Sequence, residues 1–386
     1  PWQSVLPVVI VTMSYRSLLT CASSPDCRGA VHAAFYLWYG NPEYDGRWLH
    51  WNHKILPHWD AQVDKRHPKF DWRPPDEPHS PFMPERGTYS CRDNATLQAQ
   101  FSELHRAGVD SAMISWWGRK DWEGKRDDAF SGANTDELVP AVLEAARLAG
   151  VGVSFHVEPY GGRTPQTFLD DLRHIFASYG DHPGIWREGS QRLPVFWLYD
   201  VSAQHSKDDV TAWRDALDSV RGTALDALFF CLWIGGQGDA DFVEAGGFDG
   251  AYTYFAAEGF TPGSNSKSWL SIQQQLQKRG KLFVPAVGPG YDDKRIRPWN
   301  AHNVRSRENG AYYDRMWERA VDVAPHAVSI TSYNEWGEGT QIEPAVPYTS
   351  PQGTRYEDYA PRDAAYYLES TALWARRFRD AQVCAA

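Results

Sequence analysis

One stretch of the sequence decides the fold, and it reads Ser329-Ile330-Thr331-Ser332-Tyr333-Asn334-Glu335-Trp336-Gly337-Glu338-Gly339-Thr340. The run 327–331 is apolar and β-branched, which predicts a buried strand. Glu335 and Glu338 follow this strand with Trp336 between them, and the glycines beside them let the backbone turn sharply. This combination is typical of a sugar site, although an ordinary charged loop is the alternative. Paired acids after a strand favour the site, because barrel enzymes hold their catalytic residues there.

Seven further segments upstream have the composition of strands, and a helical pattern follows each of the eight. The predicted strands are 31–39, 111–117, 152–160, 194–200, 227–234, 250–255, 282–287 and 327–331. The predicted helices cover about 94–108, 136–150, 164–179, 208–220, a short segment ending at 246–247, 266–279, 310–323 and 362–377. Strict alternation predicts one (β/α)8 TIM barrel with long βα loops, an α/β fold. A doubly wound parallel sheet is the alternative, but no Gly-x-Gly-x-x-Gly follows the first strand.

The chain of 386 residues is divided into two parts. Residues 30–386 are predicted to form a single catalytic domain, because no repeat, linker or low-complexity run interrupts them. Residues 1–29 form a separate N-terminal segment, whose apolar run 5–13 is too short to span a bilayer. This segment is either the remnant of a signal peptide or anchor, or an apolar segment docked on the domain. Cys21 and Cys27 could close a small loop in an oxidising compartment, whereas Cys231 is expected to be a buried free thiol.

Composition limits the classes of partner. Asp plus Glu number 49 against 39 Lys plus Arg, a net charge of −10, and no basic block is present. Nucleic acid and membrane contact by the catalytic domain are therefore not expected. Aromatic residues make up 14 % of the chain, with 18 Trp, and many fall at predicted strand ends, where carbohydrate sites use rings as stacking platforms. The alternative is that these rings pack under long loops.

The carboxyl ends of parallel strands meet at one mouth of a barrel, so side chains at those ends should converge. The residues at these positions are Tyr39, Trp116, Trp117, His156, Glu158, Asp200, Tyr254, Tyr291, Asn334, Glu335 and Glu338. Two long loops, 41–90 and 292–308, follow the first and seventh strands. The first is rich in His, Asn and Trp, which favours a loop that covers substrate.

Seven motifs resemble glycoside hydrolase family 99, the endo-α-1,2-mannosidases and endomannanases, and they occur in the order of that family. They are Trp38-Tyr39-Gly40-Asn41-Pro42, His50-Trp51-Asn52-His53, His156-Val157-Glu158-Pro159-Tyr160, Phe248-Asp249-Gly250-Ala251-Tyr252-Thr253-Tyr254-Phe255, Val287-Gly288-Pro289-Gly290-Tyr291, Arg297-Pro298-Trp299-Asn300 and 334–340. The resemblance implies a barrel, cleavage inside a glycan chain and retention of anomeric configuration.

The resemblance also implies separate roles for the two acids. An α-mannoside carries its axial O2 anti to the departing oxygen, so the deprotonated 2-hydroxyl can attack C1 and form a 1,2-anhydro sugar. Glu335 is implied to be the base toward O2. Glu338 is implied to be the general acid, and later the base that activates water, so its pKa is expected to be raised.

Further substrate contacts are expected from the resemblance and from position. They are Tyr39, His50, Asn52, Trp117, His156, Glu158, Tyr254, Tyr291, Arg297, Trp299 and Asn334. Structural roles are equally plausible for His53 and Arg297. Tyr252 alternates with Tyr254 and is predicted to face the helices. Trp117 offers an apolar surface without a hydroxyl, which favours mannose over glucose at the −2 sugar.

The expected partner is an oligosaccharide, and neither a metal nor a cofactor is expected. His50 and His53 lie in a loop without a second motif on a strand, which argues against a metal hydrolase. A non-catalytic glycan-binding barrel is the alternative from another class. The substrate is either a high-mannose N-glycan or α-mannan. The sequon Asn94-Ala95-Thr96 and the N-terminal segment favour the secretory pathway, in the Golgi lumen or secreted.

Overall fold

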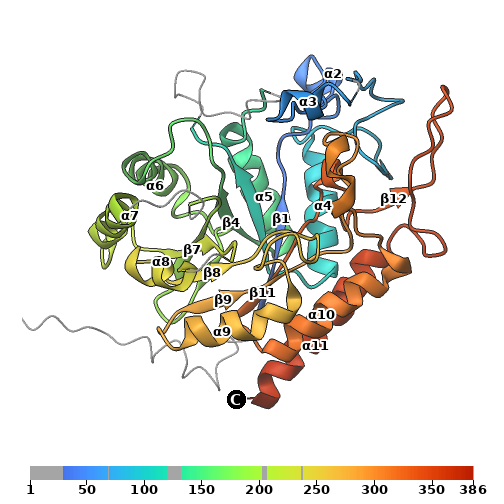
Figure 1. Ribbon diagram of the computed structural model, residues 1–386. Helices are drawn as coiled ribbons and strands as arrows, with labels where there is room; N and C mark the ends of the chain where they lie inside the picture. The colour runs from blue at the N-terminus through green and yellow to red at the C-terminus, as the bar shows by residue number, and fades with distance from the viewer. Residues whose placement is uncertain (1–28, 68, 120–131, 202–206, 236–237, 386) are drawn as a thin grey trace, which may run out of the picture.

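The computed structural model describes residues 29–67, 69–119, 132–201, 207–235 and 238–385. Its central sheet is a closed ring of parallel strands (Figure 1). These strands are β1 (Ala30–Phe35), β3 (Ser111–Trp116), β4 (Gly152–Val157), β6 (Leu193–Leu198), β7 (Leu228–Leu232), β8 (Gly250–Tyr252), β9 (Leu282–Val284), β10 (Ala286–Val287) and β11 (Ala327–Ile330). The predicted (β/α)8 barrel is confirmed.

The seventh barrel strand is divided into β9 and β10 by Pro285. Proline has no N–H to donate to a ladder. The two halves therefore pair with different neighbours: β9 pairs with β8, and β10 pairs with β11. Since β11 also pairs with β1, in the register Ala30 to Ala327, the ring closes.

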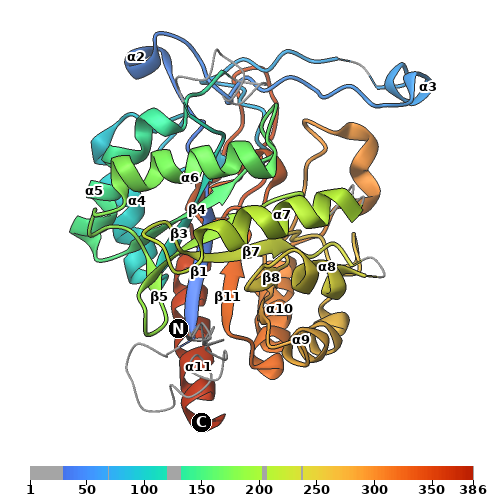
Figure 2. The same ribbon diagram turned by 90° about the vertical axis from the view of Figure 1, so that its left-hand side faces the viewer.

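Helices cover the outside of the ring and connect consecutive strands (Figures 1 and 2). They are α4 (Asn94–Arg106), α5 (Val139–Ala149) preceded by η2 (Asp136–Leu138), α6 (Pro165–Tyr179), α7 (Lys207–Val220), α8 (Asp239–Ala245), α9 (Trp269–Gln277) preceded by η3 (Ser266–Ser268), α10 (Ala311–Val323) and α11 (Tyr366–Ala385). Side chains cap several of them. Asp93 caps α4, and Thr164 forms a capping box with Thr167 on α6, which satisfies N–H groups that the helix leaves free.

The strands end earlier than predicted, because the residues after them form the active-site loops. β1 ends at Phe35 instead of Tyr39, and β8 ends at Tyr252 instead of Phe255. For this reason the orientation predicted for Tyr252, toward the helices, was wrong. The hydroxyl of Tyr252 donates to Nε2 of His156 at 2.8 Å, so Tyr252 points into the barrel and not toward the helices. The two-residue alternation does not continue past the end of the strand, and Tyr254 reaches the pocket from the loop.

The long loop after β1 contains α2 (Pro42–Asp45), α3 (Ala61–Asp64) and β2 (Met83–Pro84), and Figure 2 shows it above the barrel. β2 pairs antiparallel with β12 (Ala345–Val346). Three further short turns, η4 (Pro298–Asn303), η5 (Glu308–Gly310) and η6 (Trp336–Glu338), lie in the loops after β10 and β11. β5 (Arg187–Glu188) pairs antiparallel with the start of β6, away from these loops.

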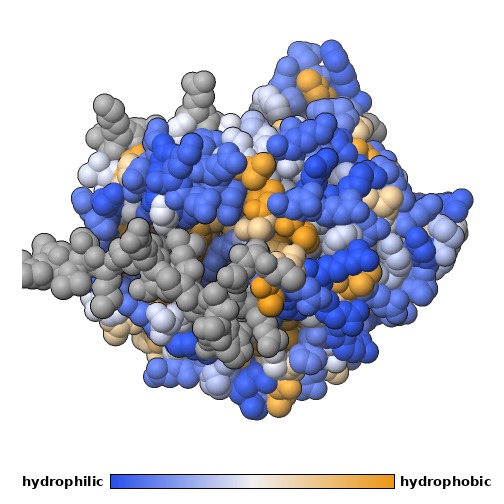
Figure 3. Space-filling view, turned by 90° about the horizontal axis from the view of Figure 1, so that it is seen from below, coloured by the Kyte–Doolittle hydropathy of each residue, from blue (hydrophilic) through white to orange (hydrophobic). Residues whose placement is uncertain are grey.

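Cys231 is a buried free thiol, as predicted, and Cys91 is another. Burial raises the pKa of both thiols. The predictions for the N-terminal segment and for Cys21 and Cys27 concern residues 1–28, which lie outside the described residues. Within the described part of the chain, no helix is both long and apolar enough to cross a bilayer. The face seen from below is mainly hydrophilic where grey atoms do not cover it, with small hydrophobic clusters (Figure 3).

Candidate active site

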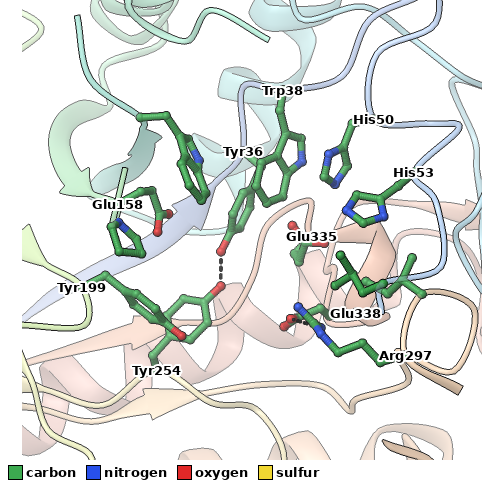
Figure 4. Close-up of a pocket in the computed structure, with 14 residues that line it drawn as sticks. Tyr36, Trp38, His50, His53, Glu158, Tyr199, Tyr254, Arg297, Glu335 and Glu338 are labelled. Carbon is green, nitrogen blue, oxygen red and sulfur yellow. Dashed lines mark hydrogen bonds and ion pairs between the residues drawn. The ribbon is translucent and has the colours of Figure 1, made fainter. Parts of the chain in front are cut away.

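A pocket of about 160 Å³ opens at the carboxyl ends of the barrel strands, above β1, β4 and β11. Figure 4 shows side chains from several loops pointing into it. Its lining consists of Tyr36, Trp38, His50, His53, Leu56, Trp117, Glu158, Pro159, Tyr199, Tyr254, Ile296, Arg297, Glu335 and Glu338. Both predicted catalytic carboxyls therefore share one pocket with aromatic rings.

The backbone after β11 brings the two acids to the pocket. Glu335 caps the turn η6: its N–H donates to Oγ of Ser332 at 2.7 Å, and its Oε1 accepts from the N–H of Gly337 at 3.1 Å. A Cβ at Gly337 would lie 2.7 Å from Nε2 of His79 and 3.0 Å from Oε1 of Glu335, so a side chain there would displace the acid. Gly339 ends the turn with φ +61°, a conformation that favours glycine.

Glu335 is only 3 % exposed. Its Oε2 has no hydrogen-bond partner among the described residues. Burial and then the charge of Glu338 raise the pKa of Glu335 well above its usual value, and Arg297 opposes this shift. A carboxylate that is desolvated in this way is a stronger base than one in water.

Glu338 contacts a cation. Nη1 of Arg297 lies 2.9 Å from Oε1 of Glu338 and 3.2 Å from Oδ2 of the fully buried Asp293. Tyr291 and Asn300 also donate to this oxygen of Asp293, each at 2.9 Å, and so hold it in place. Burial raises the pKa of Glu338, although Arg297 acts in the opposite direction. The two acids therefore titrate as a pair that retains a proton to higher pH than free carboxyls do.

Glu158 lies across the pocket from these acids in Figure 4. Its Oε1 accepts from Nδ1 of His156 at 2.9 Å and from Oγ of Ser115 at 2.7 Å. Since the carboxylate accepts, His156 donates from Nδ1, and its Nε2 accepts from Tyr252. The indole N–H of Trp117 donates to Oγ of Ser115 at 3.0 Å. Trp117 therefore offers a ring surface to a ligand, because its only polar atom is already bonded.

Tyrosines form the wall opposite the acid loop. The hydroxyls of Tyr36 and Tyr254 share a short hydrogen bond (Figure 4). The rings of Tyr199 and Tyr254 meet edge to face with centroids 5.2 Å apart. On the other side, the ring of Trp38 stacks on His50 at 4.0 Å. This wall presents hydroxyls and aromatic faces, the groups that bind the polar and apolar sides of a sugar.

Seven of the predicted site residues line the pocket, and six do not. Those in the lining are His50, Trp117, Glu158, Tyr254, Arg297, Glu335 and Glu338. Three of the others support the lining from behind. The Tyr39 hydroxyl accepts from the N–H of Trp336 at 3.0 Å, His156 supports Glu158, and Asn334 bonds the backbone of Tyr36 through both ends of its amide.

The remaining three lie outside the pocket. Asn52 is exposed in a turn whose neighbouring side chains, His50, Trp51 and His53, are all buried. Trp299 meets the rings of His58 and His67 edge to face. Tyr291 lines a neighbouring cavity and acts on the pocket through Asp293.

Two further residues predicted to reach the mouth do not line the pocket. Asp200 is exposed in a turn with φ 51°. The Trp116 indole N–H donates to Asp136, so Trp116 lies on the helical side of β3.

Sequence analysis did not single out six residues of the lining: Tyr36, Trp38, Leu56, Pro159, Tyr199 and Ile296. Tyr36 and Trp38 precede Tyr39, the residue predicted to end the first strand and to reach the pocket from there. Since β1 ends at Phe35, residues 36–39 form a loop, and the conformation of this loop directs Tyr36 and Trp38 into the pocket. Leu56 and Ile296 lie in long loops, where periodicity gives no signal.

The histidines of the long loop cluster beside the pocket. Ring centroids of His50, His53 and His79 lie 4.9 to 5.7 Å apart. Burial, together with the other two histidines, lowers the pKa of His79 well below its usual value. In the part of the chain that the structure describes, no group of three or more His, Cys, Asp or Glu side chains could hold a metal ion.

Comparisons with known proteins agree with this geometry. The model of glycosyl hydrolase family 99 matches residues 27–380. Glycoprotein endo-alpha-1,2-mannosidase of Mus musculus is 40 % identical over 356 residues, which cover 90 % of this chain and 74 % of the relative. Glycoprotein endo-alpha-1,2-mannosidase-like protein of Homo sapiens is 40 % identical over 357 residues, which cover 90 % and 75 %.

A solved structure supports the same assignment. The GH99 endo-alpha-mannosidase from Bacteroides thetaiotaomicron superposes with a TM-score of 0.80 at 38 % identity, covering 91 % of this chain and 98 % of that one. The resemblance seen in the motifs thus extends over nearly the whole barrel. This chain belongs to glycosyl hydrolase family 99 and is a glycoside hydrolase.

Proposed function

We propose that this protein is a retaining endo-α-1,2-mannosidase, which cleaves inside a high-mannose N-glycan and releases a disaccharide of glucose or mannose linked α-1,3 to mannose. The observation that carries the proposal is the pairing of Glu335 and Glu338, two buried carboxyls from one turn, in one aromatic-lined pocket. The Mus musculus relative is named as a glycoprotein endo-alpha-1,2-mannosidase, which supports it. The substrate is an oligosaccharide, and the pocket residues suit its hydroxyls and ring faces.

The two carboxyls have different surroundings, and these suit different roles. Glu335 has a buried oxygen that no described residue bonds, which suits a base that removes the proton of the 2-hydroxyl. Glu338 is bonded to Arg297, which suits an acid that alternates between charged and neutral forms. After O2 attacks C1 and the leaving oxygen takes the proton of Glu338, the Glu338 carboxylate activates water to open the 1,2-anhydro sugar. Two inversions give net retention, without an enzyme nucleophile.

Product analysis tests the proposal directly. The protein is incubated separately with Glc₁Man₉ and with yeast mannan, and the released saccharides and their anomeric configuration are identified by NMR. An α-configured disaccharide from the N-glycan is the expected product. Release of α-1,2-mannobiose units from mannan alone would favour an α-mannan endomannanase, the second candidate. No release from either substrate would favour a non-catalytic glycan-binding barrel and would contradict the proposal.

Trp117 is expected to set the preference at the −2 sugar. Its ring lines the pocket and its N–H is bonded to Ser115, so it offers no hydrogen bond to a hydroxyl of that sugar. Trp117→Tyr would add a hydroxyl, which we expect to change the ratio of kcat/KM values by about 3- to 10-fold toward glucose, the value of one hydrogen bond. Substrates with glucose and with mannose at −2 are compared. An unchanged ratio would remove Trp117 from this role.

Arg297 is expected to hold the pKa values of the acid pair down. Its cation lowers the pKa of both Glu335 and Glu338. Arg297→Gln keeps a hydrogen-bond donor but removes the charge, so both pKa values rise and deprotonation of the base requires higher pH. We expect the acidic limb of the kcat/KM profile to move up by about 1 pH unit.

The matched control for Arg297 is Lys294→Met. Lys294 is an exposed cation of the same loop, which pairs with Asp292 at 2.9 Å and lies outside the pocket lining. This variant should leave the pH profile unchanged. If the acidic limb of the kcat/KM profile stays in place in Arg297→Gln, or moves to lower pH, the Arg297 cation does not control the pKa values of Glu335 and Glu338.

We also propose that the protein works in the secretory pathway, in the Golgi lumen or after secretion. The sequon supports this, since Asn94 is exposed at the start of α4, where an oligosaccharide transferase could reach it. Loss of a glycan-dependent mass shift in Asn94→Gln, expressed through a secretory pathway, would test its use.

A further inference from the structure

A third carboxyl, Glu343, lies behind the loop that carries the two acids. It is wholly buried, it does not line the pocket, and the proposed reaction gives it no role. Its N–H donates to the carbonyl of Tyr333 at 2.9 Å, so it lies directly below the turn η6. A buried carboxylate costs free energy relative to an apolar side chain unless its partners compensate for the lost water.

Four donors converge on the two oxygens of Glu343. Oε2 accepts from the indole N–H of Trp336 at 3.0 Å and from the hydroxyl of Tyr89 at 2.8 Å. Oε1 accepts from Nε2 of Gln100 at 2.8 Å and from Nη1 of Arg86 at 3.3 Å. The carboxylate is thus fully bonded, and two of its four bonds lead toward the acid loop.

Both of these bonds lead toward the pocket, one through Trp336 and the other through Tyr89 and Asn334. Trp336 lies between Glu335 and Glu338 in the chain, and its ring is fully buried, so its orientation fixes the turn that carries both acids. The hydroxyl of Tyr89 accepts from Nδ2 of Asn334 at 3.2 Å. Asn334 in turn accepts from the N–H of Tyr36, a residue of the pocket wall, at 2.7 Å.

Charged and titratable groups surround Glu343 on every side: Arg86, Tyr89, Cys91, Glu103, Tyr333 and Tyr359. Arg86 also pairs with Glu103, which accepts from the hydroxyl of Tyr333 at 2.7 Å. Glu103 is therefore a second carboxylate of the same buried network, but in the described structure its side chain bonds Arg86 and Tyr333 and none of residues 334–338. This difference separates a general effect of the network on stability from a specific effect on the acid loop.

We propose that Glu343 is a positioning residue of the reaction: it holds the Trp336 indole and the Tyr89 hydroxyl, and through them it fixes the geometry of Glu335 and Glu338. The proposal rests on the function proposed above. Misplacement of catalytic groups by about 1 Å costs on the order of 10²-fold in rate. Loss of Glu343 should therefore lower kcat much more than it changes KM.

The first test compares Glu343→Leu with Glu343→Gln. Leucine removes the carboxylate and leaves the Trp336 indole N–H only its longer bond, to the Tyr89 hydroxyl at 3.2 Å. We expect kcat to fall about 10- to 100-fold with KM within about 3-fold of wild type. Glutamine keeps an acceptor oxygen for Trp336 and Tyr89. The NH₂ group of the new glutamine can donate to Oε1 of Gln100 once the Gln100 side-chain amide has rotated by half a turn. This oxygen accepts no hydrogen bond from the described residues in the wild-type protein. We expect Glu343→Gln to restore kcat to within about 5-fold of wild type.

Glu103→Gln is the matched control, because it changes the other carboxylate bonded to Arg86 and should leave kcat near the wild-type value. If Glu343→Leu does not fold, Trp336→Phe removes the indole N–H together with part of the buried ring and should likewise lower kcat at nearly constant KM. A folded Glu343→Leu with wild-type kcat would overturn the proposal. So would a Glu343→Gln variant as impaired as Glu343→Leu, since charge and not position would then be responsible.

A readout without substrate separates this proposal from the proposed function. Hydrogen exchange of the Trp336 indole N–H is measured by NMR in protein labelled with ¹⁵N-tryptophan, and the signal is assigned by its absence in Trp336→Phe. Protection should be high in wild type and Glu343→Gln, and much lower in Glu343→Leu. Equal protection in all three would overturn the proposal even if the enzyme cleaves the mannoside. Absence of cleavage by wild type would instead refute the proposed function alone.

Discussion

Glu335→Gln is expected to lower kcat/KM on an α-1,2-mannoside by about 10²- to 10⁴-fold, the usual contribution of a general base. This corresponds to about 3–5 kcal/mol of transition-state stabilisation. The physical reason is that the amide cannot take the proton of the 2-hydroxyl, so O2 does not become nucleophilic. The defect should persist when the leaving group is a good one such as fluoride, because attack by O2 is needed whatever departs.

The substrate provides an independent check on Glu335. Wild-type enzyme should not turn over substrates in which the 2-hydroxyl of the −1 mannose is replaced by hydrogen or fluorine. Glu369→Gln is the control variant, since Glu369 is exposed on α11, outside the lining of the pocket. Normal turnover of the 2-deoxy or 2-fluoro substrate would exclude participation of O2, and full activity of Glu335→Gln would exclude this residue as the base.

The sequence predicted the barrel well because its signals are local and repeated. All eight barrel strands were found, and each of them starts within one residue of the predicted position, since an apolar β-branched run next to a helical pattern leaves little choice. The carboxyl ends were predicted less well. Residues 36–39 have the aromatic and apolar composition of a strand, but they form a loop. The conformation of this loop depends on His50 and on the acid loop, which are distant in the sequence.

The sequence identified the acidic residues of the pocket, but it identified fewer of the other residues that line it. Glu335, Glu338 and Glu158 belong to short motifs after strands, and strand order alone brings them to one mouth. Their electrostatics depend on side chains that no local pattern reveals. The raised pKa expected for Glu338 agrees in direction with the structure, and burial together with the charge of Glu338 raises the pKa of Glu335 as well. Asn52 and Trp299 lie outside the pocket, although His50, His53 and Arg297 of the same motifs line it.

Glu338→Gln is expected to impair cleavage in proportion to the need of the leaving group for a proton. On a glycan, whose leaving group is an ordinary sugar alcohol, kcat/KM should fall by about 10²- to 10⁴-fold, because the amide cannot donate a proton to the glycosidic oxygen. On the matching disaccharide fluoride the same variant should keep most of its activity in the first step, since fluoride departs without a proton.

The contrast between the two variants distinguishes the roles of the acids. Glu335→Gln should be impaired on both substrates, whereas Glu338→Gln should be impaired mainly on the glycan. Opening of the 1,2-anhydro sugar should then limit turnover by Glu338→Gln, because this variant lacks the carboxylate that activates water. The decisive quantity is, for each variant, the ratio of kcat/KM on the glycan to kcat/KM on the disaccharide fluoride. Full activity of Glu338→Gln on the glycan would refute the assignment, and equal losses on both substrates would show that Glu338 acts on O2 or on the sugar ring and not on the leaving oxygen.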